Sequence, residues 1–112
     1  MHRSWKSLTA ASCLLALAST PASAQNEAAS PMQAVAQENN CMSCHSVQRD
    51  SLGPSFEKIA QRYKTVESAN KLLARRIAEG GVGNWGIVPM PANTQLTSDQ
   101  ALALADWILS LH

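Results

Sequence analysis

The sequence predicts a single small all-α domain with about four short helices. Three observations predict it. Apolar residues recur at helical spacing in four stretches, no stretch shows the apolar–polar alternation of a strand, and 112 residues support one small domain. Only 4% of the residues are aromatic, so apolar side chains alone would give such a domain a modest core. We therefore expect something other than side chains to fill its centre.

The first 24 residues have the pattern of a cleavable export signal. A basic start is followed by an apolar run, Leu8–Ala18, and then by small residues at Ala22-Ser23-Ala24, which signal peptidase accepts. The apolar run is shorter than the roughly 17–25 residues that span a bilayer. We therefore expect cleavage, a location in the periplasm, and no stable membrane insertion.

Cleavage after Ala24 changes both the charge and the cysteine count. The formal net charge falls from +1 to −1 because two of the nine Lys and Arg residues leave, and Cys13 leaves with them. A balanced charge argues against nucleic-acid binding, because neutralising phosphates needs an excess of Lys and Arg. The remaining chain is expected to have a flexible lead-in over residues 25–30 and one domain over residues 31–112.

Proline and serine positions, together with apolar spacing, predict the first two helices. Ser30-Pro31 is typical of an N-cap followed by proline in the first turn, which indicates a helix over residues 31–40. A second helix is predicted over Pro54–Tyr63, because apolar side chains recur at helical spacing from Phe56 to Ala60.

The other two helices flank a long loop. A helix predicted over Val66–Glu79 is stopped by Gly80-Gly81. The segment Thr97-Ser98-Asp99-Gln100 forms a capping box and opens a helix that runs to Leu111. Between them lies the loop Gly80–Leu96, and so long a loop in so small a domain is usually functional.

One motif carries the chemistry. Cys41-Met42-Ser43-Cys44-His45 is C-x-x-C-H, the signature of covalent haem attachment. Near a helix start, residues three and four apart lie on one face, so both thiols and the imidazole can point at one object. The two sulfurs would form thioethers with the haem vinyl groups, and His45 would ligate the iron. We therefore predict one covalently bound haem c with its iron.

Two other interpretations of this motif are weaker. A zinc site would need a fourth ligand, and the only other histidine after the signal is His112 at the end of the chain. A thioredoxin-like redox pair would require a βαβ context, which the sequence lacks.

The second axial ligand decides between a carrier and a catalyst. The candidates are Met32, Met42, Met90 and His112. Met42 lies inside the attachment motif and cannot reach the opposite face, and Met32 has the position of an ordinary core residue on the first helix. Met90 stands between two prolines, which restrict its backbone and favour a weak thioether bond to iron. We expect Met90 to be the ligand, with a methionine that merely fills the loop as the alternative.

Further segments accompany the motif, namely Leu52-Gly53-Pro54, Leu73–Ile77, Trp85–Asn93 and Trp107-Ile108-Leu109. Together they resemble the short bacterial class I cytochromes c, in particular the small periplasmic electron carriers of respiratory and denitrifying bacteria. The resemblance covers essentially the whole chain after the signal, and Trp85–Asn93 is its most specific part.

The resemblance implies the cytochrome c fold, with short helices wrapped round one haem. It implies that His45 and Met90 are the axial iron ligands. It also implies that the Pro54 carbonyl accepts the His45 Nδ1–H and that Asn93 hydrogen-bonds near the Met90 sulfur.

The resemblance further implies that Arg76 and the Trp85 indole N–H bind a haem propionate. The alternative for Arg76 is a solvated helix charge, and Trp107 is expected to pack in the core. Two positions depart from the family. The family often has an aromatic residue near the position of Ala36, and it often has glycine just before the first haem cysteine, where this chain has Asn40. The first helix is therefore expected to pack less fully against the last.

A His/Met pair closes both axial positions, so no open site remains for peroxide, oxygen or a substrate. We therefore expect no enzymatic activity and a one-electron carrier between respiratory-chain complexes and a terminal reductase or oxidase. The expected partners are a cytochrome complex as donor and a terminal reductase or oxidase as acceptor, and the protein itself is expected to be a monomer. Two alternatives are a haem peroxidase or gas sensor with a labile sixth ligand, and a fixed subunit of a reductase complex.

Redox partners are expected to meet an apolar rim at the exposed haem edge, with basic residues nearby for steering. The predicted rim consists of Val47, Leu52, Ile87 and Ala92, and the predicted steering residues are Lys58, Arg62 and Lys64.

Overall fold

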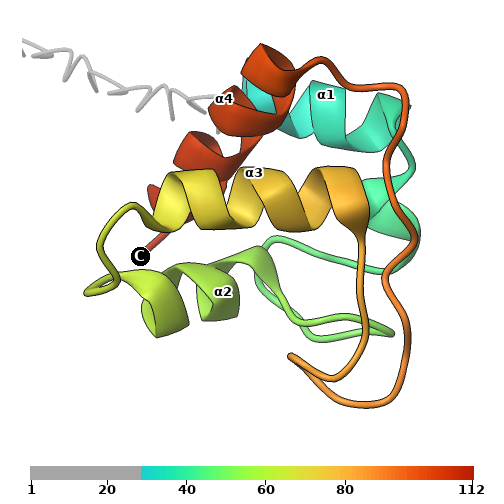
Figure 1. The fold of residues 1–112 in the computed structure, drawn as a ribbon, viewed down its shortest axis with the longest axis vertical. Helices are drawn as coiled ribbons and strands as arrows, with labels where there is room; N and C mark the ends of the chain where they lie inside the picture. The colour runs from blue at the N-terminus through green and yellow to red at the C-terminus, as the bar shows by residue number, and fades with distance from the viewer. Residues whose placement is uncertain (1–28) are drawn as a thin grey trace, which may run out of the picture.

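The computed structural model describes residues 29–112, which form four α-helices and one short 3-10 helix (Figure 1). In chain order these are α1 (Pro31–Glu38), η1 (Cys41–Ser43), α2 (Phe56–Tyr63), α3 (Ala69–Glu79) and α4 (Ser98–Leu109). Within residues 29–112 the only β-type pairing is an isolated bridge between Gly81 and Met90. The all-α prediction is confirmed. The predicted signal peptide and residues 25–28 of the predicted lead-in lie outside the described residues.

Helix α4 is the centre of the packing, because it contacts α1, α2 and α3 (Figure 1). The largest fully buried side chain, Leu104, lies on this helix. The buried core cluster comprises Ala36, Phe56, Ile59, Leu73, Ile77, Ala101, Leu104, Ala105 and Ile108. In the described part of the chain, no helix has the length and apolar character that crossing a membrane requires.

Helix α1 begins as predicted, with the Ser30 hydroxyl accepting the N–H of Gln33 at 3.1 Å and proline in the first turn. It ends at Glu38, earlier than predicted. Ala36 is fully buried in the core. Asn40, which follows the helix, has φ +60°, in the left-handed region that glycine and asparagine tolerate best. The left-handed backbone therefore explains why asparagine is accepted at this position.

Helix α2 begins at Phe56, not at Pro54 as predicted. Ser55 is its N-cap, with the backbone extended and the hydroxyl accepting the N–H of Lys58 at 3.2 Å. Pro54 therefore lies outside the helix, which leaves its carbonyl free to bind another group.

Helix α3 begins at Ala69, whereas apolar spacing predicted Val66. Ser68 has φ +53°, a left-handed conformation that interrupts any helical run through residues 66–68. The residues before it form turns instead.

Helix α4 has the predicted capping box. The Thr97 hydroxyl accepts the N–H of Gln100 at 3.2 Å, and the Gln100 side chain accepts the N–H of Thr97 at 2.9 Å. Trp107 packs against the core as expected, with its ring 5.4 Å from that of Phe56 in an edge-to-face arrangement.

Candidate functional site

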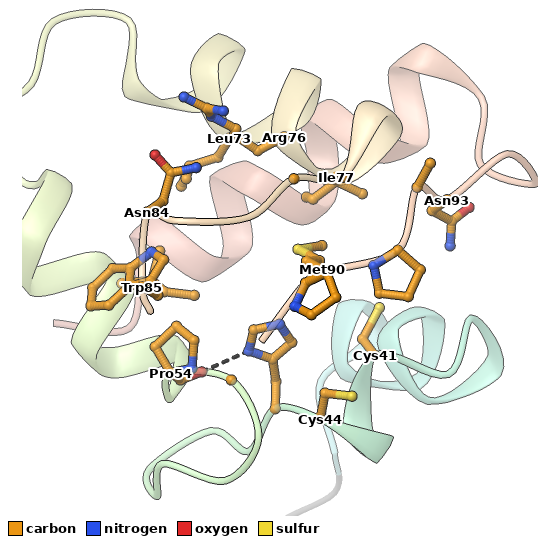
Figure 2. Close-up of a pocket in the computed structure, with 18 of the residues that line it drawn as sticks. Cys41, Cys44, Pro54, Leu73, Arg76, Ile77, Asn84, Trp85, Met90 and Asn93 are labelled. Atoms are coloured by element: carbon orange, nitrogen blue, oxygen red, sulfur yellow. Dashed lines mark hydrogen bonds between the residues drawn. The ribbon is translucent and has the colours of Figure 1, made fainter. Parts of the chain in front are cut away.

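A cavity of about 390 Å³ opens between η1, the loop that follows α3, and the inner faces of α2, α3 and α4. All eight residues that the sequence singled out for the cofactor line this one cavity (Figure 2). They are Cys41, Cys44, His45, Pro54, Arg76, Trp85, Met90 and Asn93. Much of the remaining wall is apolar and comprises Phe56, Ile59, Tyr63, Leu73, Ile77, Leu104 and Ile108.

Among the methionines at described positions, only Met90 lines the cavity. Met32 lies on α1 and packs against the core, and Met42 borders a separate surface depression. His112 is exposed at the end of the chain, with its Nδ1 2.8 Å from the carbonyl oxygen of Leu109. Met90 is therefore the thioether that faces the same cavity as the histidine of the motif.

The two cysteines of the motif are free thiols and are half-buried. The turn that carries them is closed by the Cys44 and His45 N–H groups, which donate to the Cys41 carbonyl at 3.2 and 2.9 Å. Figure 2 shows both sulfurs on the same side of the cavity. Burial raises the pKa of the Cys41 thiol above its ordinary value. Two adjacent free thiols on one wall fit the covalent attachment of a haem.

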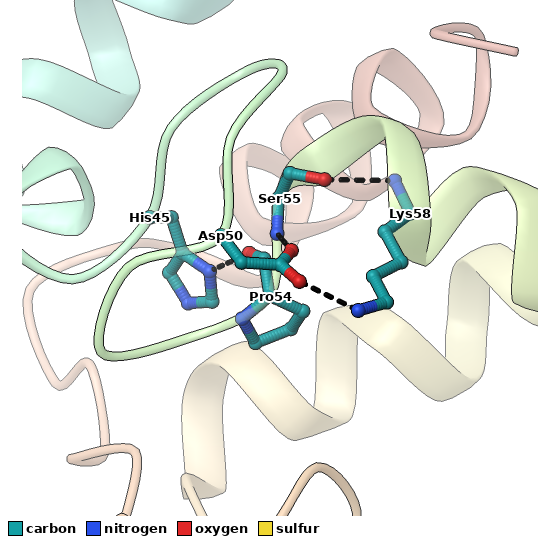
Figure 3. A network of polar contacts seen from close by, with 5 residues as sticks. All are labelled: His45, Asp50, Pro54, Ser55 and Lys58. Carbon is teal, nitrogen blue, oxygen red and sulfur yellow. Dashed lines mark hydrogen bonds and ion pairs between the residues drawn. The ribbon is translucent and has the colours of Figure 1, made fainter.

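The imidazole of His45 is oriented by a backbone carbonyl. Its Nδ1 lies 2.6 Å from the Pro54 oxygen (Figure 3). A carbonyl oxygen can only accept, so Nδ1 carries the proton and donates it. In the neutral imidazole with this tautomer, the opposite nitrogen, Nε2, has a lone pair for a metal.

Two neighbours hold the His45 ring in place. The Phe56 ring stacks on it at 5.2 Å between centroids and 23° between planes. On the Gly53 side, a Cβ would lie 2.7 Å from His45 Cε1, closer than real side chains approach. A side chain at position 53 would therefore push the imidazole out of this position. Gly53 stood out in the sequence only as part of a resembling segment, because its contact with the ring leaves no local signal.

The segment after His45 is attached to the start of α2. The N–H groups of Phe56 and Glu57 donate to the carbonyls of Ser46 and Val47 at 2.9 and 3.0 Å. These N–H groups have no partner within their own helix, so the contact satisfies both. It also fixes the histidine relative to the core.

Met90 is held by its backbone. Gly81 and Met90 exchange two hydrogen bonds of 2.9 and 2.8 Å. Gly80 has φ +68°, and a Cβ there would collide with the Met90 carbonyl oxygen and lie 2.6 Å from the Ala92 nitrogen. Gly80 and Gly81 were predicted only to stop α3. They also form the surface against which the methionine loop packs.

Asn93 has a structural role that the sequence analysis did not predict. Its side-chain oxygen accepts the N–H groups of Gln95 and Leu96, both at 3.0 Å, and its own N–H donates to the Ile77 carbonyl at 3.0 Å. Within residues 29–112 the side-chain nitrogen of Asn93, Nδ2, has no hydrogen-bond partner, so its bond near the Met90 sulfur stays a prediction.

Three hydrogen-bond donors gather at the end of the cavity away from the cysteines: Arg76, Trp85 and Asn84 (Figure 2). In the described part of the chain, none of their side-chain N–H groups has a hydrogen-bond partner. Such a group of unpaired donors fits the carboxylates of a haem propionate. Asn84 was missed by the sequence analysis.

Arg62, one of the predicted steering residues, is exposed and also contacts the loop after α3. Its Nη1 donates to the Asn84 carbonyl at 2.7 Å, and its guanidinium lies 4.3 Å from the centroid of the Trp85 indole. Lys58, a second predicted steering residue, forms an ion pair with Asp50. Lys64 is exposed and bonds only to Gln61, at 3.4 Å, among the described residues.

The predicted apolar rim is partly exposed. Leu52 is 62% exposed and lies at the cavity, whereas Ile87 is 93% exposed and does not line it. Ala92 lines the cavity, and Val47 borders the separate depression instead. Two exposed residues that were not predicted, Val82 and Val88, also line the cavity.

Comparison with known proteins identifies the family. A family profile for cytochrome c matches residues 29–112. Cytochrome c-552 from Nitrosomonas europaea is 38% identical over 111 residues, 99% of each chain. Cytochrome c-551 from Stutzerimonas stutzeri is 40% identical over 96 residues, 86% of each chain.

Solved structures give the same result. The crystal structure of Nitrosomonas europaea cytochrome c552 superposes with a TM-score of 0.69 at 42% identity, covering 70% of this chain and 98% of that one. A class 1 cytochrome from Sideroxydans lithotrophicus superposes with a TM-score of 0.60 at 31% identity, covering 71% and 91%. This chain therefore belongs to the cytochrome c family, and its cofactor is one haem c with iron, whose covalent attachment Cys41 and Cys44 fit.

Proposed function

We propose that this protein is a periplasmic one-electron carrier in which His45 and Met90 are the two axial ligands of the haem iron. The observation that carries the proposal is the convergence of these two side chains on one cavity. Met90 is the only methionine at a described position that lines it, and two hydrogen bonds to Gly81 fix its backbone.

The bound haem supplies the chemistry, which is the exchange of one electron between Fe(II) and Fe(III). His45 offers Nε2 to the iron, because Nδ1 donates to the Pro54 carbonyl. Met90 offers a soft sulfur, which favours the reduced iron. With His45 and Met90 both holding the iron, no position on the metal would remain for a substrate, and we propose that the protein is not an enzyme.

The donors at the far end of the cavity would anchor the haem carboxylates. Arg76 would contribute a charge-assisted hydrogen bond and Trp85 its indole N–H. The Asn84 amide lies beside them and can donate a third bond. Fixing the propionates would reduce reorganisation of the site when the iron changes charge.

Redox proteins are the proposed partners, with a cytochrome complex as electron donor and a terminal reductase or oxidase as acceptor. They would approach the exposed apolar residues at the cavity mouth, Leu52 and Val88, with exposed Ile87 on the same loop as Val88. We further propose a monomer that is exported by a cleavable signal peptide over residues 1–24.

Absorption spectra of the holoprotein in both redox states test the ligation. We expect low-spin iron, a charge-transfer band from the thioether to ferric iron, and no binding of carbon monoxide to the reduced protein. Met90→Leu keeps the volume but removes the sulfur, so it should abolish the band and admit carbon monoxide. Met32→Leu is the matched control, because that methionine packs on α1 away from the cavity, and it should leave both properties unchanged.

Rapid binding of carbon monoxide to the unmodified reduced protein would overturn the proposal in favour of a peroxidase or gas sensor. An unchanged band in Met90→Leu would show that another group is the sixth ligand.

A further inference from the structure

One peptide group connects the axial histidine to a surface carboxylate. The peptide between Pro54 and Ser55 presents its carbonyl to His45 Nδ1 at 2.6 Å. The same peptide presents its N–H to Asp50 Oδ1 at 2.9 Å. Figure 3 shows the resulting chain from the imidazole through the peptide to the carboxylate.

The second oxygen of Asp50 is also engaged. Oδ2 accepts a hydrogen bond from Lys58 Nζ at 2.5 Å, and the Lys58 backbone N–H donates to the Ser55 hydroxyl at 3.2 Å. Ser55 is itself 4% exposed, so the peptide it shares with Pro54 is shielded on the protein side. The carboxylate is therefore held against this one peptide and is not free to turn away.

We propose that Asp50 is a positioning residue for the iron ligand, acting through the Pro54–Ser55 peptide to strengthen the hydrogen bond from His45 Nδ1. A carboxylate that accepts the N–H of a peptide group polarises that group and increases the negative charge on its carbonyl oxygen. The oxygen then accepts more strongly from Nδ1, and the imidazole becomes a more basic ligand. The inference rests on the proposed ligation by His45.

Asp50 is charged at neutral pH, which the proposal requires. The hydrogen bond from Lys58 holds the pKa of the Asp50 carboxyl below its usual range, and the Ser55 N–H lowers it further. Lys58 has the opposite influence on the peptide, because its positive charge withdraws electron density from the carboxylate. Asp50 should therefore stabilise Fe(III) and lower the reduction potential, and Lys58 should raise it.

The test compares two acid-to-amide variants of the holoprotein. Asp50→Asn keeps the shape and an acceptor oxygen but removes the charge. Glu57→Gln removes one negative charge from the start of α2, and the Glu57 carboxylate has no hydrogen bond among the described residues. The readouts are the His45 Nδ1–H proton resonance of the reduced protein and the reduction potential.

We expect Asp50→Asn to move the Nδ1–H resonance upfield, because the hydrogen bond weakens. We also expect it to shift the equilibrium toward Fe(II) by about two- to fivefold, the range of half-exposed charge interactions. That shift corresponds to a rise of roughly 20–40 mV, since tenfold is 59 mV for one electron. Glu57→Gln should leave the resonance in place.

A second variant gives an effect of opposite sign. Lys58→Gln leaves the carboxylate without its counter-charge, so it should move the Nδ1–H resonance downfield and lower the reduction potential. A merely structural role of the ion pair would make Asp50→Asn and Lys58→Gln change the resonance in the same direction. That outcome, or an Nδ1–H resonance that Asp50→Asn leaves unmoved, would overturn the inference. The absorption spectrum of the unmodified protein tests ligation separately, so a failure of the proposed function is distinguishable.

Discussion

The guanidinium of Arg62 lies 4.3 Å from the centroid of the Trp85 indole, although Arg62 belongs to α2 and Trp85 to the loop after α3. Its Nη1 also donates to the carbonyl of Asn84 at 2.7 Å. The pair is a cation–π contact combined with a charged hydrogen bond. It connects α2 to the loop that carries Met90, so one side chain links two walls of the haem cavity.

Arg62→Gln should loosen this connection. We expect the free energy of unfolding of the holoprotein to fall by about 1 kcal/mol. This loss combines an exposed cation–π contact with part of the energy of a charged hydrogen bond. Lys64→Gln removes the same charge near the same helix end, where the side chain bonds only to Gln61 among the described residues, and should be nearly neutral. Guanidinium titration of the oxidised protein measures both, and equal losses would show that charge alone is responsible.

Gly80→Ala should displace the methionine loop. Gly83→Ala is the control, because Gly83 also has positive φ, +94°, but a Cβ there meets nothing within 4 Å. Gly83→Ala should therefore lower the free energy of unfolding by only about 1 kcal/mol, because alanine is strained at positive φ. Gly80→Ala should lose about 1–3 kcal/mol more, because its Cβ collides with the Met90 carbonyl.

Spectroscopy separates the two glycine variants further. Gly80→Ala should weaken the thioether-to-ferric charge-transfer band, because a shifted Met90 backbone moves the sulfur. Gly83→Ala should preserve the band. A full-strength band in Gly80→Ala would mean that the loop adjusts without moving the Met90 sulfur.

Gly53→Ala should turn the imidazole of His45. A Cβ at position 53 would lie 2.7 Å from Cε1 and 3.0 Å from Nδ1, so the ring must move away from it. We expect a weaker hydrogen bond to Pro54, seen as an upfield Nδ1–H resonance, and a loss of about 1–3 kcal/mol of stability. Leu52→Ala, one residue earlier at an exposed position, should leave the resonance unchanged.

The Asp50–Lys58 pair predicts a pH dependence of stability. The pKa of Asp50 is lowered in the folded protein, so its contribution is fully present above the unfolded-state value and is lost as the pH falls through the folded-state value. The stability difference between the native protein and Asp50→Asn should be constant from about pH 7 to pH 5 and shrink below about pH 4. Denaturant titrations of both holoproteins across this range measure it, and a gap that widens in acid would contradict the assignment.

The sequence predicted much of the fold because its signals are local. Ser30-Pro31 and the capping box at Thr97 act within one helical turn, so they located the starts of α1 and α4 correctly. The starts of α2 and α3 were predicted too early. At Ser55 a side-chain cap, and at Ser68 a left-handed backbone, outweighed apolar spacing.

The residue types of the haem site were equally visible, because the C-x-x-C-H motif and the two prolines around Met90 are contiguous. Contacts between distant segments were not visible. They include the fit of Gly53 against His45, the bridge from Gly81 to Met90 and the stacking of Arg62 on Trp85.

Features that depend on neighbouring residues can thus be predicted from the sequence alone. They include the thiols that fit haem attachment, the side chains that can ligate iron, and the starts of helices. Packing decides which of the candidate side chains share one cavity. Met90 shares the cavity with His45 while Met32 and Met42 lie elsewhere, and Asp50 reaches the peptide beside His45, because α4 and the loop after α3 close around a common centre. Such contacts depend on the simultaneous position of all the helices, which no short stretch of sequence encodes.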